Sequence, residues 1–169
     1  MKKKNLVSVV IPAYNEEAFI ERTLQAVHSQ DYKPYEVIVV DNASTDETSR
    51  IASRYADVYR LEQRGVSRAK NYGAKKAGGN VLFFLDADSV MSRNTLEQTN
   101  RLINLGLVGG SFVSGIIDPS LKDRVFGRAF SLMCYYKRIF SMCAFCRKDI
   151  FVHMNSEHNV YNENVAQTI

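Results

Sequence analysis

The chain has 169 residues, of which 46% are hydrophobic and 24% charged, and these proportions are ordinary for one globular domain with a sizeable core. The net charge of +4 suits an anionic small-molecule ligand, but it is too small and too scattered to indicate a nucleic-acid partner. No stretch approaches the roughly 18 consecutive apolar residues of a membrane-spanning helix, so we expect a cytoplasmic protein.

Strands and helices alternate along the first two-thirds of the chain. The predicted strands are short apolar runs: 6–11, 36–40, 58–61 and 81–85. The predicted helices between them are 16–29, a segment from Ser44 to about Tyr55, and 66–77. In the second of these helices, Ser44 and Glu47 have the spacing of a capping box, so Ser44 is the predicted N-cap.

This alternation predicts right-handed β-α-β crossovers and an α/β fold with a mostly parallel, doubly wound sheet flanked by helices. In such sheets ligands bind outside the carboxyl ends of the strands. Polar residues follow three of the predicted strands: Tyr14, Asn15 and Glu16 after the first, Asp41 and Asn42 after the second, Asp86 and Asp88 after the fourth. We therefore expect these side chains to meet at one edge of the sheet.

The segment 83–88, Phe-Phe-Leu-Asp-Ala-Asp, places two carboxylates one residue apart at the end of a buried strand. Two nearby carboxylates repel each other, and hard oxygen ligands for Mg²⁺ or Mn²⁺ are the usual reason to tolerate them. An isolated D-x-D is more often a solvated acidic turn. The polar residues at the other strand ends favour the metal interpretation here.

The pattern is weaker beyond residue 90. A helix is predicted over 94–104, strand character extends over 107–117, and 121–140 forms an amphipathic helix with a basic polar face. For 121–140 we expect core packing or a homodimer seam; the alternative is a peripheral contact with the inner face of a membrane. Cys134, Cys143 and Cys146 form neither an even disulfide set nor a four-ligand metal site, so we expect buried, reduced thiols.

Four linked motifs resemble those of the family 2 glycosyltransferases, which have the GT-A fold. The matching segments are 7–17 (VSVVIPAYNEE), 39–46 (VVDNASTD), 65–74 (GVSRAKNYGA) and 84–88 (FLDAD). The match is good over residues 5–100 and looser to about 150. The resemblance implies a single GT-A-like domain over 1–169, with 5–100 as the nucleotide-sugar-binding half and 101–169 as a divergent, incomplete acceptor half.

The resemblance implies transfer of a sugar, with inversion, from a UDP- or GDP-sugar to an acceptor hydroxyl on a glycan, a lipid-linked molecule or a protein, in cell-envelope polysaccharide synthesis. The residues implied to line the nucleotide-sugar site are Pro12, Tyr14, Glu16, Asp41, Arg68, Lys70, Asp86 and Ala87. Of these, Asp41 would hydrogen-bond the base, and Lys70 and Arg68 would neutralise the phosphates. Asp86 and Asp88 would hold the divalent cation, Mn²⁺ or Mg²⁺.

The catalytic base of the family lies in a downstream Glu-Asp pair, which here reads Glu163-Asn164. An amide cannot act as a general base at neutral pH, so Glu163, or Glu157 upstream, would have to replace it. The chain ends five residues later, and we expect a copy that is shortened at its carboxyl terminus. Donor binding is thus predicted with more support than transfer.

Two other functions fit parts of the pattern. In a haloacid-dehalogenase-type phosphatase, Asp86 would be the nucleophile and Asp88 the general acid, but that family places the motif on its first strand. The second alternative is a non-catalytic nucleotide-sugar-binding protein, which the amide at Asn164 favours.

Overall fold

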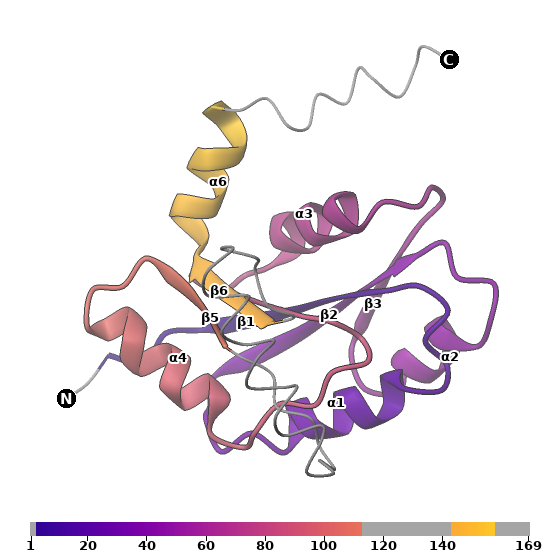
Figure 1. Ribbon diagram of the computed structural model, residues 1–169, viewed down its shortest axis with the longest axis horizontal. Coiled ribbons are helices and arrows are strands. Elements are labelled where there is room, and N and C mark those ends of the chain that lie inside the picture. Colours follow the sequence, from indigo (N-terminus) through magenta and orange to yellow (C-terminus); the bar gives the residue numbers. More distant parts are fainter. Residues whose placement is uncertain (1–2, 113–142, 158–169) are drawn as a thin grey trace, which may run out of the picture.

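The structure, a computed structural model, describes residues 3–112 and 143–157, and these form one six-stranded sheet with helices on both faces (Figure 1). The strands are β1 (Val7–Ala13), β2 (Tyr35–Asn42), β3 (Asp57–Leu61), β4 (Val81–Leu85), β5 (Gly109–Phe112) and β6 (Cys143–Arg147). The helices are α1 (Ile20–His28), α2 (Thr48–Ala52), α3 (Val66–Lys76), α4 (Thr95–Asn104) and α6 (Lys148–Glu157).

The strand order in the sheet is β3-β2-β1-β4-β6-β5. Strands β1 to β4 run parallel, whereas β6 is antiparallel to both of its neighbours, β4 and β5. The predicted α/β fold with a mostly parallel, doubly wound sheet is therefore confirmed. Because β1, β2 and β4 point the same way, their carboxyl ends lie at one edge, as the sequence predicted.

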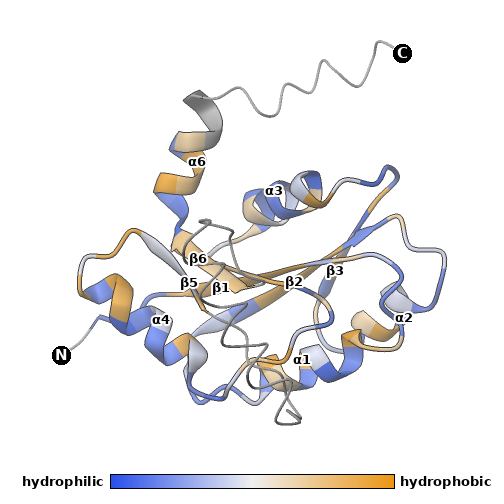
Figure 2. Cartoon of the chain, viewed as in Figure 1, coloured by the Kyte–Doolittle hydropathy of each residue, from blue (hydrophilic) through white to orange (hydrophobic). Residues whose placement is uncertain are grey.

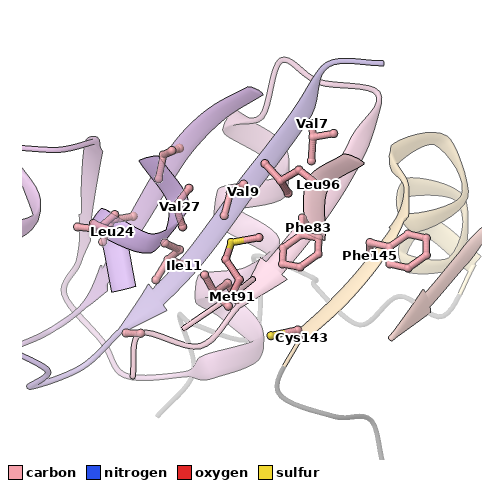
Figure 3. Close-up of a cluster of buried hydrophobic side chains, with 14 of the residues drawn as sticks. Val7, Val9, Ile11, Leu24, Val27, Phe83, Met91, Leu96, Cys143 and Phe145 are labelled. Carbon is pink, nitrogen blue, oxygen red and sulfur yellow. The ribbon is translucent and has the colours of Figure 1, made fainter. Parts of the chain in front are cut away.

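Alternate residues of the strands feed two separate hydrophobic clusters, one on each face of the sheet. On the face covered by α1, α2 and α4, Val7, Val9 and Ile11 pack with Leu24 and Leu96 (Figure 3). On the other face, α3 and α6 cover a cluster whose strand residues are Val10, Ile38, Val40, Leu82 and Phe84. Burial on both faces explains why β1, β4 and most of β2 are apolar runs, and Figure 2 shows orange segments in these central strands.

Helix α3 lies unusually close to the sheet because Gly73 faces it. A Cβ atom at this position would be only 2.4 Å from Cγ1 of Val10 and 3.2 Å from Cγ2 of Val40. The missing side chain lets the backbone of α3 approach β1 and β2, and this places Lys70, one turn earlier, beside the carboxyl edge of the sheet.

Several element boundaries differ from the predictions. Helix α1 begins at Ile20, not at residue 16, and β2 extends over 35–42, so Asp41 belongs to the strand. The predicted helix from Ser44 to Tyr55 was too long, because α2 spans only Thr48–Ala52. The predicted capping box was wrong as well: the N-cap position is Glu47, and no side chain caps the helix there.

The carboxyl-terminal half is described only in part. Of the predicted strand at 107–117, Gly109–Phe112 is observed as β5, while residues 113–117 and the predicted helix over 121–140 lie outside the described residues. The periodicity along the chain did not predict β6 or α6. In the part of the chain that the structure describes, no helix is long and apolar enough to cross a membrane.

The two described cysteines, Cys143 and Cys146, are reduced thiols on β6, as the sequence predicted. Cys143 joins the cluster of α1 and α4, and Cys146 packs against the cluster of α3. The two side chains thus project to opposite faces of the sheet, which excludes a disulfide or a shared metal within this C-x-x-C. Burial raises the pKa of the Cys146 thiol to about 11, so this sulfur is unreactive at neutral pH.

Candidate functional site

The loops that follow β1 and β2 are joined by hydrogen bonds between side chains and backbone. The Asn15 N–H donates to the Ser44 hydroxyl (3.0 Å), and the Thr45 N–H donates to Oδ1 of Asn15 (2.8 Å). Asn15 has a φ of 52°, a left-handed conformation that asparagine tolerates better than most residues. Ser44 therefore ties two loops together and does not cap α2.

The same two loops are joined a second time through Thr48 and Asp46. The buried Thr48 hydroxyl accepts the Glu16 N–H (2.7 Å) and donates to Oδ1 of Asp46 (2.6 Å). Oδ2 of Asp46 accepts the Glu17 N–H (3.1 Å). Asp46 is thus a structural residue at the start of α2, and the hydrogen bond from its own backbone N–H holds Glu16 at the carboxyl edge.

Asp41, predicted to bind the base, is fully buried at the end of β2. Its Oδ1 accepts the Ser44 N–H (2.8 Å), and its Oδ2 accepts the Ser49 hydroxyl (2.8 Å). Nη1 of Arg60, the residue beside Asp41 in the register of β2 and β3, lies 3.6 Å from Oδ2. In this conformation the carboxylate stabilises the loop that begins at Ala43.

Tyr14, the first residue after β1, has a partner that the sequence did not indicate. The guanidinium carbon of Arg64, in the loop between β3 and α3, lies 3.6 Å from the centroid of the Tyr14 ring. At this distance the guanidinium and the ring are in van der Waals contact. Arg64 could not be found from a local pattern, because it is one exposed cation among several.

The segment after β4 forms a turn in which the Ser89 N–H donates to the Asp86 carbonyl oxygen (3.0 Å). Ala87, at the middle of the turn, is buried, and its carbonyl oxygen accepts the Thr23 hydroxyl of α1 (2.7 Å). The turn exposes Asp88 and leaves Asp86 half-buried. These contacts hold the backbone of the turn from which both carboxylates project.

The carboxylates of Asp86 and Asp88 lie close enough to Glu16 to raise its pKa, and Asp88 likewise raises the pKa of Asp86. Burial raises the pKa of Glu16, and the charges of Asp88, Asp46 and Asp86 raise it further. Burial also raises the pKa of Asp86; Lys70 opposes this rise and the charge of Asp88 adds to it. Glu16, which follows β1, and Asp86 and Asp88, which follow β4, thus form one acidic cluster at the edge where the sequence predicted that they would meet.

Lys70 provides the cation next to this cluster. Its Nζ lies 3.8 Å from Oδ1 of Asp86, and the two side chains are 35% and 36% exposed. A pair this exposed contributes little to stability but leaves both groups accessible to a ligand. Arg68, two residues before Lys70, instead donates from Nη1 to Oε1 of Gln63 (2.8 Å), so the structure does not bring it to the acidic cluster.

The donor set at this edge suits a hard divalent cation that is shared with a ligand. Within the described residues, no group of three or more His, Cys, Asp or Glu side chains could hold a metal ion by itself. The half-buried Asp86 and the exposed Asp88 are oxygen donors whose mutual repulsion a cation would relieve. Such a pair fits Mg²⁺ or Mn²⁺, which binds through one or two carboxylates together with phosphate oxygens and water.

Pro12 is half-buried within β1, and the predicted catalytic residues Glu163 and Asn164 lie outside the described residues. Glu157 belongs to α6, but its side chain is not described. A cavity of about 1100 Å³ is lined by residues such as Lys3, Gly79 and Arg147, at the opposite edge of the sheet. It lies away from the acidic cluster, so the candidate site is an open edge and not this cavity.

Comparison with known proteins gives one family and many relatives. A family model described as glycosyl transferase family 2 matches residues 8–155. The glycosyltransferase AglE of Haloferax volcanii is 40% identical over 117 residues, which cover 62% of this chain and 38% of AglE. The poly(ribitol-phosphate) beta-N-acetylglucosaminyltransferase TarS of Staphylococcus aureus is 33% identical over 106 residues, 57% of this chain and 18% of TarS. The chain thus spans less than half the length of these relatives.

Two solved structures share the fold. TarS in complex with UDP-GlcNAc has a TM-score of 0.62 at 28% identity, covering 68% of this chain and 36% of the TarS chain. The mannosyltransferase PcManGT of Pyrobaculum calidifontis, in complex with GDP-Man and Mn²⁺, has a TM-score of 0.70 at 26% identity. The match covers 90% of this chain and 47% of PcManGT.

Proposed function

Since the chain belongs to glycosyl transferase family 2, with a GT-A fold, we propose that its acidic edge binds the diphosphate of a UDP- or GDP-sugar through Mn²⁺ or Mg²⁺ and supports transfer of the sugar. The observation that carries the proposal is the cluster of Glu16, Asp86 and Asp88 beside Lys70. The bound UDP-GlcNAc of TarS and the GDP-Man and Mn²⁺ of PcManGT support it by similarity.

In the proposed complex Asp88 and Asp86 hold the cation, and Lys70 turns from Asp86 toward the phosphates. A cation held by Asp86 and Asp88 would supply positive charge for the negative charge that develops on the leaving diphosphate. Lys70 adds a further positive charge beside Asp86. Arg68 is proposed as a second phosphate contact. To reach the phosphates, the Arg68 side chain would have to leave its hydrogen bond with Gln63.

Tyr14 and Asp41 are proposed to hold the base, with Pro12, Glu16 and Ala87 lining the site. Tyr14 offers an aromatic ring at the carboxyl end of β1. Asp41 is buried, so a base N–H can reach its carboxylate only if part of that carboxylate becomes accessible. We expect Arg60, which lies beside Oδ2 of Asp41 and whose side chain is 62% exposed, to shift locally and open this access. Uracil and guanine each carry an N–H that a carboxylate accepts, so both bases stay candidates.

The acceptor hydroxyl is proposed to lose its proton to Glu163 or Glu157, with inversion at the anomeric carbon, because Asn164 cannot accept it at neutral pH. The acceptor is proposed to be a cell-envelope polymer or another glycan, and similarity to TarS and to the putative teichuronic acid biosynthesis glycosyltransferase TuaG of Bacillus subtilis supports this. A cytoplasmic site of action, with a membrane contact through 121–140, stays part of this proposal.

Calorimetric titration of UDP and GDP, each with Mn²⁺ and then with EDTA, tests the proposal. We expect Mn²⁺-dependent binding of one nucleotide, and loss of the Mn²⁺ dependence in Asp88→Ala, whose exposed side chain contributes little to the fold. Asp31→Ala is the matched control, since this exposed carboxylate pairs with Arg93 outside the site.

Unchanged Mn²⁺-dependent affinity in Asp88→Ala would contradict the metal assignment, and no binding of either nucleotide to the wild type would contradict the donor site. Metal-dependent binding without hydrolysis or transfer of the sugar from UDP-GlcNAc or GDP-Man would favour the non-catalytic alternative. The phosphatase alternative fits poorly, because the D-x-D motif follows β4, the fourth strand of a family 2 glycosyltransferase sheet.

A further inference from the structure

The stack of Arg64 on Tyr14 joins two loops at the carboxyl edge of the sheet. Tyr14 follows β1, and Arg64 lies between β3 and α3, 50 residues later in the sequence. The 3.6 Å between the guanidinium carbon and the ring centroid leaves no space for a third planar group. Arg64 therefore covers the aromatic surface that a base would use in the proposed nucleotide site.

The residues on both sides of Arg64 are hydrogen-bonded, Gly65 through its backbone and Gln63 through its side chain. The Gly65 N–H donates to Oδ1 of the buried Asn42 (2.8 Å), and Oε1 of Gln63 accepts from Nη1 of Arg68 (2.8 Å). Arg64 itself is exposed. Movement of Arg64 away from the ring is thus expected to be a swing of its long side chain, while the Gly65 N–H stays bonded to Asn42.

Two acidic groups of this edge have other cationic partners. Asp41 pairs with Arg60, and Asp86 pairs with Lys70. The guanidinium is planar and stacks on aromatic faces, unlike the compact ammonium of lysine. A nucleobase bound on Tyr14 would present its outer face to the same guanidinium, so Arg64 would exchange stacking on the tyrosine ring for stacking on the base.

We propose that Arg64 is a further binding residue of the donor site, which closes the nucleotide site by stacking: the base of the nucleoside diphosphate enters between Tyr14 and Arg64. This inference rests on the proposed function, since it concerns the same donor site. It assigns to Arg64 a contact with the base, whereas Lys70 and Arg68 are proposed to contact the phosphates.

The test is a titration of UDP and GDP, with Mn²⁺, into the wild type, Arg64→Ala and Arg64→Lys. A stacking contact predicts that the affinity for the bound nucleotide falls about threefold to fivefold in Arg64→Ala, and that Arg64→Lys, which keeps the charge but not the plane, is weakened nearly as much. Tyr14→Ala should lose more, about fivefold to a hundredfold, as expected for a base–aromatic stack. Arg54→Ala, an exposed arginine paired with Glu21, is the control expected to bind like the wild type.

The other outcomes overturn the inference. Wild-type affinity in Arg64→Lys would mean that Arg64 acts only through its charge, and tighter binding in Arg64→Ala would mean that it merely competes with the base. Unchanged affinity in Arg64→Ala would mean that Arg64 does not touch the base. If the wild type binds neither UDP nor GDP, the proposed function itself fails, and this result is distinct from a failure of the Arg64 assignment alone.

Discussion

At the scale of single residues, the candidate site combines groups that are costly to bring together. Glu16, Asp86 and Asp88 repel one another, and burial adds to the cost for Glu16 and Asp86. Lys70 offsets part of this cost for Asp86. Carboxylates with raised pKa values at one edge are typical of a functional site, because a bound cation relieves the repulsion that the fold otherwise retains.

The raised pKa of Asp86 predicts a stability effect with a definite sign. In the pH window between the ordinary pKa of aspartate and the raised pKa in the folded protein, the folded state binds more protons than the unfolded state, so stability falls as the pH rises through this window. We therefore expect Asp86→Asn to unfold at a higher urea concentration than the wild type at neutral pH. The difference should shrink as the pH falls below the raised pKa.

Urea titrations of both proteins at several pH values measure this difference. A less stable Asp86→Asn at neutral pH would show that the pair with Lys70 outweighs burial, contrary to the expectation. Asp31→Asn serves as the control, because its carboxylate is exposed and pairs with Arg93.

Thr48 gives a second prediction at this scale. Its buried hydroxyl is the acceptor for the Glu16 N–H (2.7 Å), so Thr48→Val keeps the shape but leaves that N–H without its partner. We expect a loss of about 1–3 kcal/mol in the free energy of unfolding, measured by urea denaturation. Thr45→Val is the matched control: Thr45 is exposed, and its hydroxyl contacts Asn15 only at 3.4 Å. Equal losses in the two variants would contradict the role of Thr48.

At the scale of elements, the position of α3 depends on a close approach that one glycine permits. The Cβ of Gly73→Ala would meet Cγ1 of Val10 at 2.4 Å, so α3 would have to move away from β1. Alanine is otherwise the better helix residue by about 1 kcal/mol, and overpacking of a core typically costs about 1–3 kcal/mol. We expect Gly73→Ala to be destabilised overall, with weaker metal-dependent nucleotide binding because Lys70 moves with α3.

Thermal unfolding and nucleotide titration of Gly73→Ala test this role. Gly78→Ala is the control, since a Cβ there first meets the Glu36 carboxylate at 3.5 Å, an ordinary contact. A Gly73→Ala protein as stable as the wild type would show that α3 can shift without loss.

Elements with a strong local pattern were predicted well, and the short helix was not. Strands 81–85 and 58–61 and the helices from residues 66 and 94 were found within a residue or so, because apolar runs and helical spacing extend over their whole length. Helix α2 was predicted too long. Ser44 and Glu47 have the spacing of a capping box, but Ser44 bonds to Asn15, a partner 29 residues away in the sequence.

At the scale of the whole molecule, binding of cation and nucleotide should be coupled. Within the described residues no cluster of three ligands could hold a metal alone, so the proposed cation would need the diphosphate as a further donor. We expect the melting temperature to change little with Mn²⁺ alone or UDP or GDP alone, and to rise when both are present. At a ligand concentration of about 100 times Kd the gain is about 2.7 kcal/mol. An equal rise with Mn²⁺ alone, measured by differential scanning fluorimetry, would contradict a shared site.

The sequence alone determined the fold class and the edge of the sheet at which the three carboxylates Glu16, Asp86 and Asp88 lie. Strand and helix periods are local, and parallel strands bring their carboxyl ends to one edge, so these features need no knowledge of long-range contacts. The family match over residues 8–155 agrees with them.

Only the tertiary structure decided which side chains are partners. The stack of Arg64 on Tyr14, the pairing of Asp41 with Arg60 and the projection of Cys143 and Cys146 to opposite faces all depend on strand order, register and loop paths. These contacts join residues that are distant in the sequence or are separated by the pleat of a strand. A local pattern of residue types does not specify them, because each depends on where another segment of the chain has folded.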